Sequence, residues 1–188
     1  SIRLQEEKRM QFNSIYIVNI LTEKTLREYA KKTNQKYGSE IYFNPDPRRL
    51  TYLQDKQGNL HGTLSRRFDG ALPGTVNPVG IWEIKEYYYT TTFGSRIADG
   101  VYETQLDGYE LQELSEITNR KIYHIYFLDD YNTWWNMGKS YLCRIIDMLH
   151  VGLVDEVIFG KEAFERWPIV VEELITIADT EQGIFETL

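Results

Sequence analysis

The chain has 188 residues, of which 42% are hydrophobic and 26% are charged, as expected of one globular domain. Its formal net charge of −7 disfavours a broad nucleic-acid-binding surface but is compatible with a local one. There is no secretory signal and no apolar run of the ~20 residues that cross a bilayer. The single cysteine excludes an internal disulfide and a cysteine-based zinc site, so we expect a cytoplasmic protein without membrane contact.

The first part of the chain has a helical pattern. Residues 5–12 and 22–37 both predict helices, and Thr22 is a suitable N-cap for the second. The apolar stretch 15–21 between them fits either a continuous helix or a short strand, and we favour the helix.

Strands follow from about residue 40. Residues 41–43, 50–54 and 60–68 predict strands, and a hairpin turn is expected at 55–59. The strand 60–68 leads into Asp69, after which Gly and Pro residues predict a turn. Residues 79–87 predict the next strand, whose apolar character is typical of a central strand covered on both faces.

The second half alternates helices and strands. We expect helices at 100–118, 131–149 and 161–179, the last interrupted near Pro168, with strands at 121–128 and 154–159. This order predicts an α/β fold with a central mixed sheet flanked by helices on both faces. We expect one domain over 1–188, with a core at about 23–160 and a helical segment at 161–188. The absence of an initial Met suggests a processed start, a tag scar or a fragment of a longer protein.

Two acids and a lysine lie where the strands around Asp69 are expected to meet. Side chains alternate along a strand, so Glu83 and Lys85 point to one face and Ile84 to the other. Asp69, Glu83 and the backbone carbonyl of Ile84 would suffice to hold Mg²⁺, which prefers oxygen ligands and keeps several waters. Lys85 could then orient a water and stabilise negative charge on a phosphate. A structural ion pair between Glu83 and Lys85 is the alternative.

Other charged residues could complete such a site. A third carboxylate is expected from the N-terminal helix, with Glu28 and Glu23 as candidates. Arg66, Arg67 and Arg96 are the candidates for contacts to substrate phosphates, which position a nucleic acid without reading its sequence.

Asp69 followed by Glu83-x-Lys85 resembles the motif of the PD-(D/E)XK nuclease superfamily, although Phe68 stands where the family name has Pro. Gln105 and Tyr109 are similar to the Gln-xxx-Tyr feature of RecB-like members, and the spacing puts them on one helix face. A surface Gln105 and a packed Tyr109 are the alternative.

The resemblance implies a restriction-endonuclease-like fold and Mg²⁺-dependent hydrolysis of DNA, with Mn²⁺ as a substitute. It implies metal ligation by Asp69 and Glu83 and catalysis by Lys85. Cleavage of both strands requires two sites, so a homodimer is expected, with specificity supplied by a partner subunit or a missing segment. The alternatives are a non-catalytic binding or assembly module of the same fold, and a carboxylate-pair hydrolase with another substrate.

The remaining candidates are weaker. The histidines lack metal-ligand spacing and are expected to be packing or surface residues: His61, His124 and His150. We expect Cys143 to be a buried thiol and Asp129-Asp130 to cap the following helix rather than bind metal. At least one residue of the pair Trp134-Trp135 is expected in the core.

Overall fold

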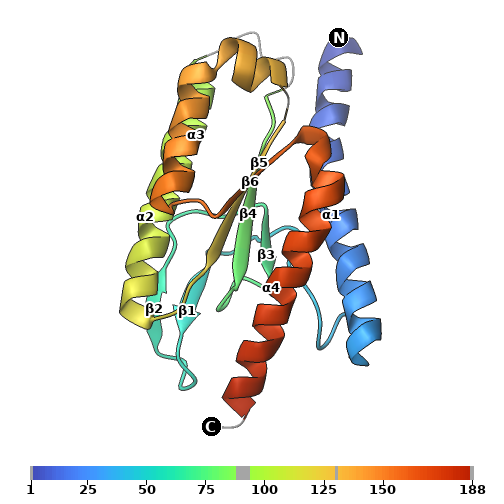
Figure 1. Cartoon of the computed structure of the whole chain (residues 1–188), viewed down its shortest axis with the longest axis vertical. Coiled ribbons are helices and arrows are strands. Elements are labelled where there is room, and N and C mark those ends of the chain that lie inside the picture. Colours follow the sequence, from blue (N-terminus) through green and yellow to red (C-terminus); the bar gives the residue numbers. More distant parts are fainter. Residues whose placement is uncertain (1, 88–93, 130, 187–188) are drawn as a thin grey trace.

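A mixed four-stranded sheet lies at the centre of the computed structural model, with helices on both faces (Figure 1). The structure describes residues 2–87, 94–129 and 131–186, and the side chains of residues 14–87, 94–129 and 131–180. None of the helices in these ranges combines the length and the apolarity that crossing a bilayer requires.

The chain begins with a helix, continues through four strands and then alternates between helices and strands. The helices are α1 (Ile2–Thr33), α2 (Ser95–Thr118), the π-helix η1 (Asn132–Met137), α3 (Lys139–Val151), the 3₁₀-helix η2 (Gly160–Glu162) and α4 (Ala163–Glu186). The strands are β1 (Tyr52–Gln54), β2 (Leu60–Thr63), β3 (Gly70–Leu72), β4 (Gly80–Lys85), β5 (Tyr123–Leu128) and β6 (Glu156–Phe159).

The central sheet has the order β3-β4-β5-β6. β3 is antiparallel to β4, whereas β4, β5 and β6 are parallel to one another. The carboxyl ends of these three strands therefore lie at the same edge of the sheet, which is where ligand sites form in parallel α/β sheets. β1 and β2 form a separate antiparallel hairpin.

Alternation along the strands divides the core into two layers. Ile125 and Phe127 of β5 pack toward α1 and α4, where the ring of Trp167 meets that of Phe127 at 5.0 Å between centroids. Tyr126 and Leu128 point the other way, toward α2 and α3. The prediction of a mixed sheet covered on both faces is confirmed.

Several predicted elements have different limits in the structure. α1 is one continuous helix, as favoured, but it ends at Thr33 rather than at residue 37. The prediction of a strand at 60–68 was wrong: β2 ends at Thr63, and Asp69 directly precedes a further strand, β3, in the segment that reads as a turn. Residues 41–43 form only isolated bridges beside them.

The C-terminal half also departs from the predictions in detail. The helix expected at 131–149 is divided at Gly138 into η1 and α3, and α4 continues through Pro168 without interruption. Cys143 is exposed, which corrects the prediction of a buried thiol. Trp134 is buried and Trp135 is exposed, so one of the two does lie in the core.

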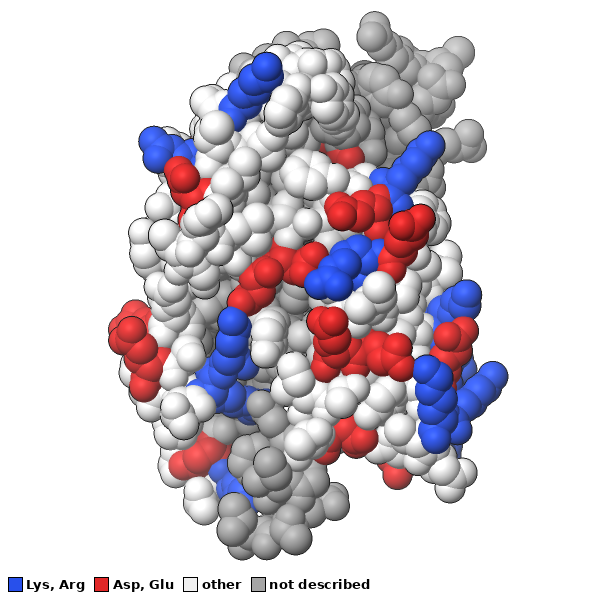
Figure 2. Space-filling view, in the orientation of Figure 1, with Lys and Arg blue, Asp and Glu red and all other residues white. Residues whose placement is uncertain are grey.

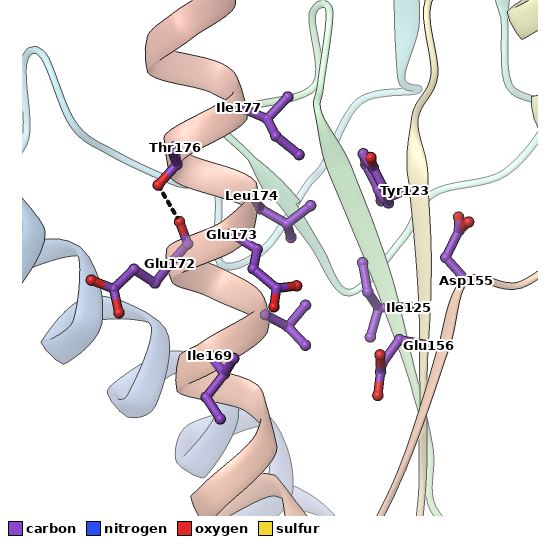
Figure 3. A pocket seen from close by; sticks show the side chains of 11 residues that line it. Tyr123, Ile125, Asp155, Glu156, Ile169, Glu172, Glu173, Leu174, Thr176 and Ile177 are labelled. Atoms are coloured by element: carbon purple, nitrogen blue, oxygen red, sulfur yellow. Dashed lines mark hydrogen bonds between the residues drawn. The ribbon is translucent and has the colours of Figure 1, made fainter.

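The surface carries no broad basic area on the face shown in Figure 2, where acidic and basic side chains are interspersed over the described residues. A groove of about 660 Å³ runs between α4 and the strands β5 and β6 (Figure 3). Its floor is apolar, with Ile125 and Leu174 among its residues, and carboxylates of Asp155 and Glu172 lie along it.

Candidate active site

Asp69 is fixed beside Glu83 by two hydrogen bonds to the β4 backbone. Its N–H donates to the carbonyl of Trp82 at 3.0 Å, and its Oδ2 accepts from the N–H of Ile84 at 2.7 Å. These are the peptide groups on either side of Glu83. The aspartate that directly precedes β3 and the glutamate of β4 are thus neighbours, as the sequence predicted, although Asp69 comes before a strand rather than ending one.

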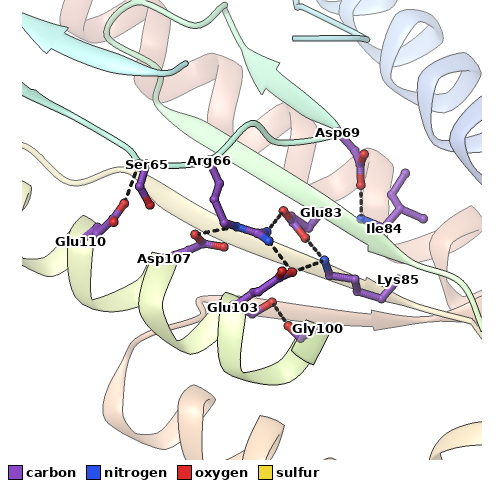
Figure 4. A network of polar contacts seen from close by, with 11 residues as sticks. Ser65, Arg66, Asp69, Glu83, Ile84, Lys85, Gly100, Glu103, Asp107 and Glu110 are labelled. Carbon is purple, nitrogen blue, oxygen red and sulfur yellow. Dashed lines mark hydrogen bonds and ion pairs between the residues drawn. The ribbon is translucent and has the colours of Figure 1, made fainter. Parts of the chain in front are cut away.

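Glu83 and Lys85 share the face of β4 that looks toward α2 (Figure 4). The Glu83 side chain is 5% exposed and that of Lys85 is 16% exposed, and the Lys85 Nζ is in direct contact with Oε2 of Glu83. Ile84 lies on the other face and packs against the core between the sheet, α1 and α4. The alternation predicted for these three residues is confirmed.

Arg66 joins the same cluster from the segment between β2 and β3. Its Nη2 lies 2.5 Å from Oε1 of Glu83, and its Nε lies 3.2 Å from Oδ1 of Asp107. Its Nη1 contacts Glu103, whose Oε2 also lies 3.8 Å from Nζ of Lys85. The cluster of Arg66, Glu83, Lys85, Glu103 and Asp107 is called the charged cluster below.

α2 supplies the acids on the far side of the charged cluster. Glu103, Asp107 and Glu110 are spaced i, i+4, i+7, which places them along one side of the helix. Glu110 accepts a hydrogen bond of 2.9 Å from the backbone N–H of Ser65, next to Arg66. Gly100 lets α2 lie close to Tyr87, because a Cβ at position 100 would overlap the Tyr87 hydroxyl.

Burial and charge shift the pKa values of these groups in ways that follow from the contacts. Burial raises the pKa of Asp69, the hydrogen bond from Ile84 partly offsets this, and the charge of Glu83 raises it further. Burial raises the pKa of Asp107 to about 6, against the opposing charge of Arg66. Burial alone would lower the pKa of Arg66, but Glu83, Asp107 and Glu103 together raise it.

The residues Asp69 and Glu83 fit a divalent cation by their chemistry. Both offer the hard carboxylate oxygens that Mg²⁺ prefers, and one or two carboxylates with several waters are its usual protein environment. The charge of Glu83 raises the pKa of Asp69, while the two carboxylate oxygens of Glu83 contact Arg66 and Lys85. Among the described residues, no group of three or more His, Cys, Asp or Glu side chains is arranged to hold a metal ion.

The structure does not bring the expected acids of the N-terminal helix to the charged cluster. Glu28 and Glu23 lie on α1, which packs with α4 on the opposite face of the sheet, and Glu23 is paired with Arg27. Glu103 of α2 is the additional acid in contact with Arg66 and near Lys85. The helical spacing of Glu103 and Asp107 is the sequence feature from which acids on this side of α2 could have been predicted.

Gln105 and Tyr109 are not part of the charged cluster. They contact each other at 3.5 Å, and their helical positions differ by about half a turn from the side of α2 that carries Glu103 and Asp107. Arg67 and Arg96 are exposed, so both remain accessible to a ligand, whereas Arg66 is held by three carboxylates.

Two other predictions have clear outcomes. Asp129 does not cap the helical segment after it; its Oδ2 accepts from the N–H of Tyr87 at 2.5 Å and its Oδ1 accepts from Nε1 of Trp134 at 2.7 Å. Asp130 lies outside the described residues. His124 is a buried packing residue, and its Nδ1 lies 2.9 Å from the carbonyl of Leu153.

Comparison with known proteins gives a family but no characterised relative. A family model described as a domain of unknown function, DUF7687, matches residues 2–174. No curated protein and no solved structure matches the chain.

Proposed function

The chain belongs to the DUF7687 family, whose function is unknown, and from the charged cluster we propose that it is a divalent-metal-dependent nuclease with a restriction-endonuclease-like fold. The observation that carries the proposal is the position of Glu83. It is a buried carboxylate on a central, otherwise apolar strand, with Asp69 bound across its two flanking peptides and Lys85 on the same face. Buried charges are costly unless they are paired, and here Arg66 and Lys85 pair with Glu83.

The protein groups take separate roles in this proposal. Asp69, Glu83 and the backbone carbonyl of Ile84 would hold Mg²⁺ or Mn²⁺. Such an ion supplies Lewis-acid activation of a phosphodiester and of a bound water. Lys85 lies in contact with Glu83, and in this proposal it would stabilise the negative charge that develops on the phosphate. Arg66 fixes the orientation of the Glu83 carboxylate.

DNA is the proposed substrate, with a homodimer supplying the second site for double-strand cleavage. Exposed Arg67 and Arg96 would contact phosphates beside the site. Sequence specificity would then come from a partner subunit or from a segment outside this chain.

A cleavage assay tests the proposal. Wild-type protein is incubated with supercoiled plasmid and with single-stranded RNA, each with Mg²⁺, with Mn²⁺ and with EDTA. We expect metal-dependent DNA cleavage, lowered about 10²–10⁴-fold by Lys85→Ala and unchanged by Lys24→Ala, which alters an exposed lysine of α1. Circular dichroism establishes that both variants fold. A Lys85→Ala variant as active as wild type would overturn the role of this site.

One observation favours a second candidate, a non-catalytic binding or assembly module. Glu83 is already neutralised by Arg66 and Lys85, which is the arrangement of a structural ion network. That function predicts no cleavage of either nucleic acid with any metal, together with loss of stability in the cluster variants.

A further inference from the structure

A second cavity opens on the opposite face of the sheet from the charged cluster. It has a volume of about 240 Å³ and lies at the carboxyl ends of β4 and β5, between α1 and the start of α4. Its walls are mainly apolar and include Ile17, Phe127, Ala163 and Phe164, and the carboxyl groups of Glu86 and Asp129 also line it. Ligand sites in parallel sheets form at this edge.

Glu86 brings an unsatisfied oxygen to this cavity. Its Oε1 is buried and has no hydrogen-bond partner among the described residues, while its carboxylate accepts a hydrogen bond from the backbone of Ser14. Buried polar atoms in folded proteins almost always have a partner, so one without a protein partner calls for a ligand or an ordered water. A donor group inside the cavity would satisfy it.

The neighbouring charges favour a positively charged donor. Asp129 already accepts hydrogen bonds from Tyr87 and Trp134 with its two carboxylate oxygens, so Glu86 is the acid left to meet a ligand. Lys161 also lines the cavity but its side chain is exposed. Two carboxyl groups against one exposed lysine line the cavity, which favours a cation over an anion as its ligand.

The larger groove along α4 differs in this respect (Figure 3). Three of the carboxylates that line it are paired within the chain: Asp155 with Lys121, Glu156 with Arg166 and Glu172 with Lys32. The Glu86 cavity combines a mainly apolar wall with a buried carboxylate oxygen that has no partner among the described residues.

We propose that the Glu86 cavity is a binding site for a small organic cation, in which an ammonium group meets the Glu86 carboxylate and an apolar ring packs against Ile17, Phe127 and Phe164. The volume of about 240 Å³ is below the usual range of about 300–1,000 Å³ for drug-sized ligands, so it suits a molecule with a single ring. The site is separate from Glu83 and Lys85, because Glu86 lines this cavity together with Ile84, which lies on the opposite face of β4 from those two residues. It does not depend on the proposed nuclease function.

Benzylamine and benzyl alcohol are the probes, since they share one ring and differ in the charged donor; the amine is protonated at neutral pH. Isothermal titration calorimetry is expected to show binding of benzylamine to wild-type protein about tenfold or more tighter than benzyl alcohol. Glu86→Gln keeps the shape of the side chain and should lower benzylamine affinity about tenfold or more, leaving benzyl alcohol unchanged. Glu116→Gln, which alters an exposed acid of α2, should behave as wild type.

Amide chemical-shift changes locate the probe in each protein. Changes at Ser14, Gly160 and Ala163, which border the cavity, are the expected result. Three results would overturn the proposal: no benzylamine binding by wild type up to about 10 mM, unchanged benzylamine affinity in folded Glu86→Gln, or shifts confined to the groove along α4. If a single ordered water is the only partner of Glu86, wild-type protein will not bind benzylamine, which is the first of these results.

Discussion

Arg66 Nη2 and Glu83 Oε1 lie 2.5 Å apart at a point where the glutamate side chain is only 5% exposed. The same guanidinium also holds Glu103 and Asp107, so one arginine from a connecting segment neutralises acids from a strand and a helix. Arg66 therefore joins β4 to α2, and its contact with Glu83 orients the carboxylate on which the proposed chemistry depends.

Removal of Arg66 is therefore expected to destabilise the fold. Arg66→Ala leaves Glu83 and Asp107 buried without this partner, and breaking a buried ion pair on one side costs about 3–5 kcal/mol. Because the Arg66 side chain is 28% exposed and Lys85 still pairs with Glu83, the lower end of that range is expected. Urea denaturation measures the free energy of unfolding.

The adjacent residue provides the control. Arg67 is exposed, so Arg67→Ala should change the unfolding free energy by no more than about 0.5 kcal/mol. If the two variants were equally stable, Arg66 would have no structural role and its contacts in the charged cluster would not persist in solution.

Gly70→Ala tests how β3 places Asp69. A Cβ at Gly70 would overlap the indole ring of Trp82 across the strand pair, so the strand or the ring must shift. Overpacking of this kind costs about 1–3 kcal/mol. At Gly74 the nearest atom to an added Cβ is 4.0 Å away, and Gly74→Ala should cost little. Thermal denaturation of both variants distinguishes them, and equal melting temperatures would contradict this packing.

The same glycine explains why β3 was not predicted from the sequence. Residues 69–74 contain two glycines and a proline, which locally favour a turn. The requirement for Gly70 comes from Trp82, a residue on another strand, and no local pattern contains that information. The strand β4, by contrast, was predicted within wider limits, because the mostly apolar stretch around Glu83 and Lys85 is a property of the strand itself.

Only part of the charged cluster could be predicted from the sequence, because the rest of it depends on tertiary packing. The spacing of Glu83 and Lys85 fixes their common face, but the segment that carries Arg66 and the side of α2 that carries Glu103 are brought together by tertiary packing. The expectation of an acid from the N-terminal helix was wrong for the charged cluster, because α1 lies against the other face of the sheet.

His124 should make the fold sensitive to acid. Burial lowers its pKa in the folded state, whereas in the unfolded chain it titrates near the usual value of about 6.5. Below that pH the unfolded chain binds more protons at this position, so the stability contributed by neutral His124 is present above it and is lost as pH falls. Asp107, with its pKa raised to about 6, acts in the opposite direction.

A comparison of variants isolates the histidine. His124→Gln removes the titrating group, so its unfolding free energy should fall less than that of wild type between about pH 7.5 and about pH 5.5, a range that spans the histidine pKa. Asp107 contributes equally to both proteins. His61→Gln, at an exposed histidine, should follow wild type. A pH dependence in His124→Gln as steep as that of wild type would refute the assignment.

Metal binding tests the central proposal without knowledge of the substrate or its sequence. Electron paramagnetic resonance of Mn²⁺ titrated into the protein reports bound metal directly, and Asp69→Asn and Glu83→Gln remove one candidate ligand charge each. Asp147→Asn, at an exposed aspartate of α3, is the control. The proposal predicts one bound Mn²⁺ per chain in wild type and in Asp147→Asn, and weakened binding in the other two variants. Wild-type protein that binds no Mn²⁺, or Asp69→Asn and Glu83→Gln variants that bind it as wild type does, would contradict a metal-dependent site at Asp69 and Glu83.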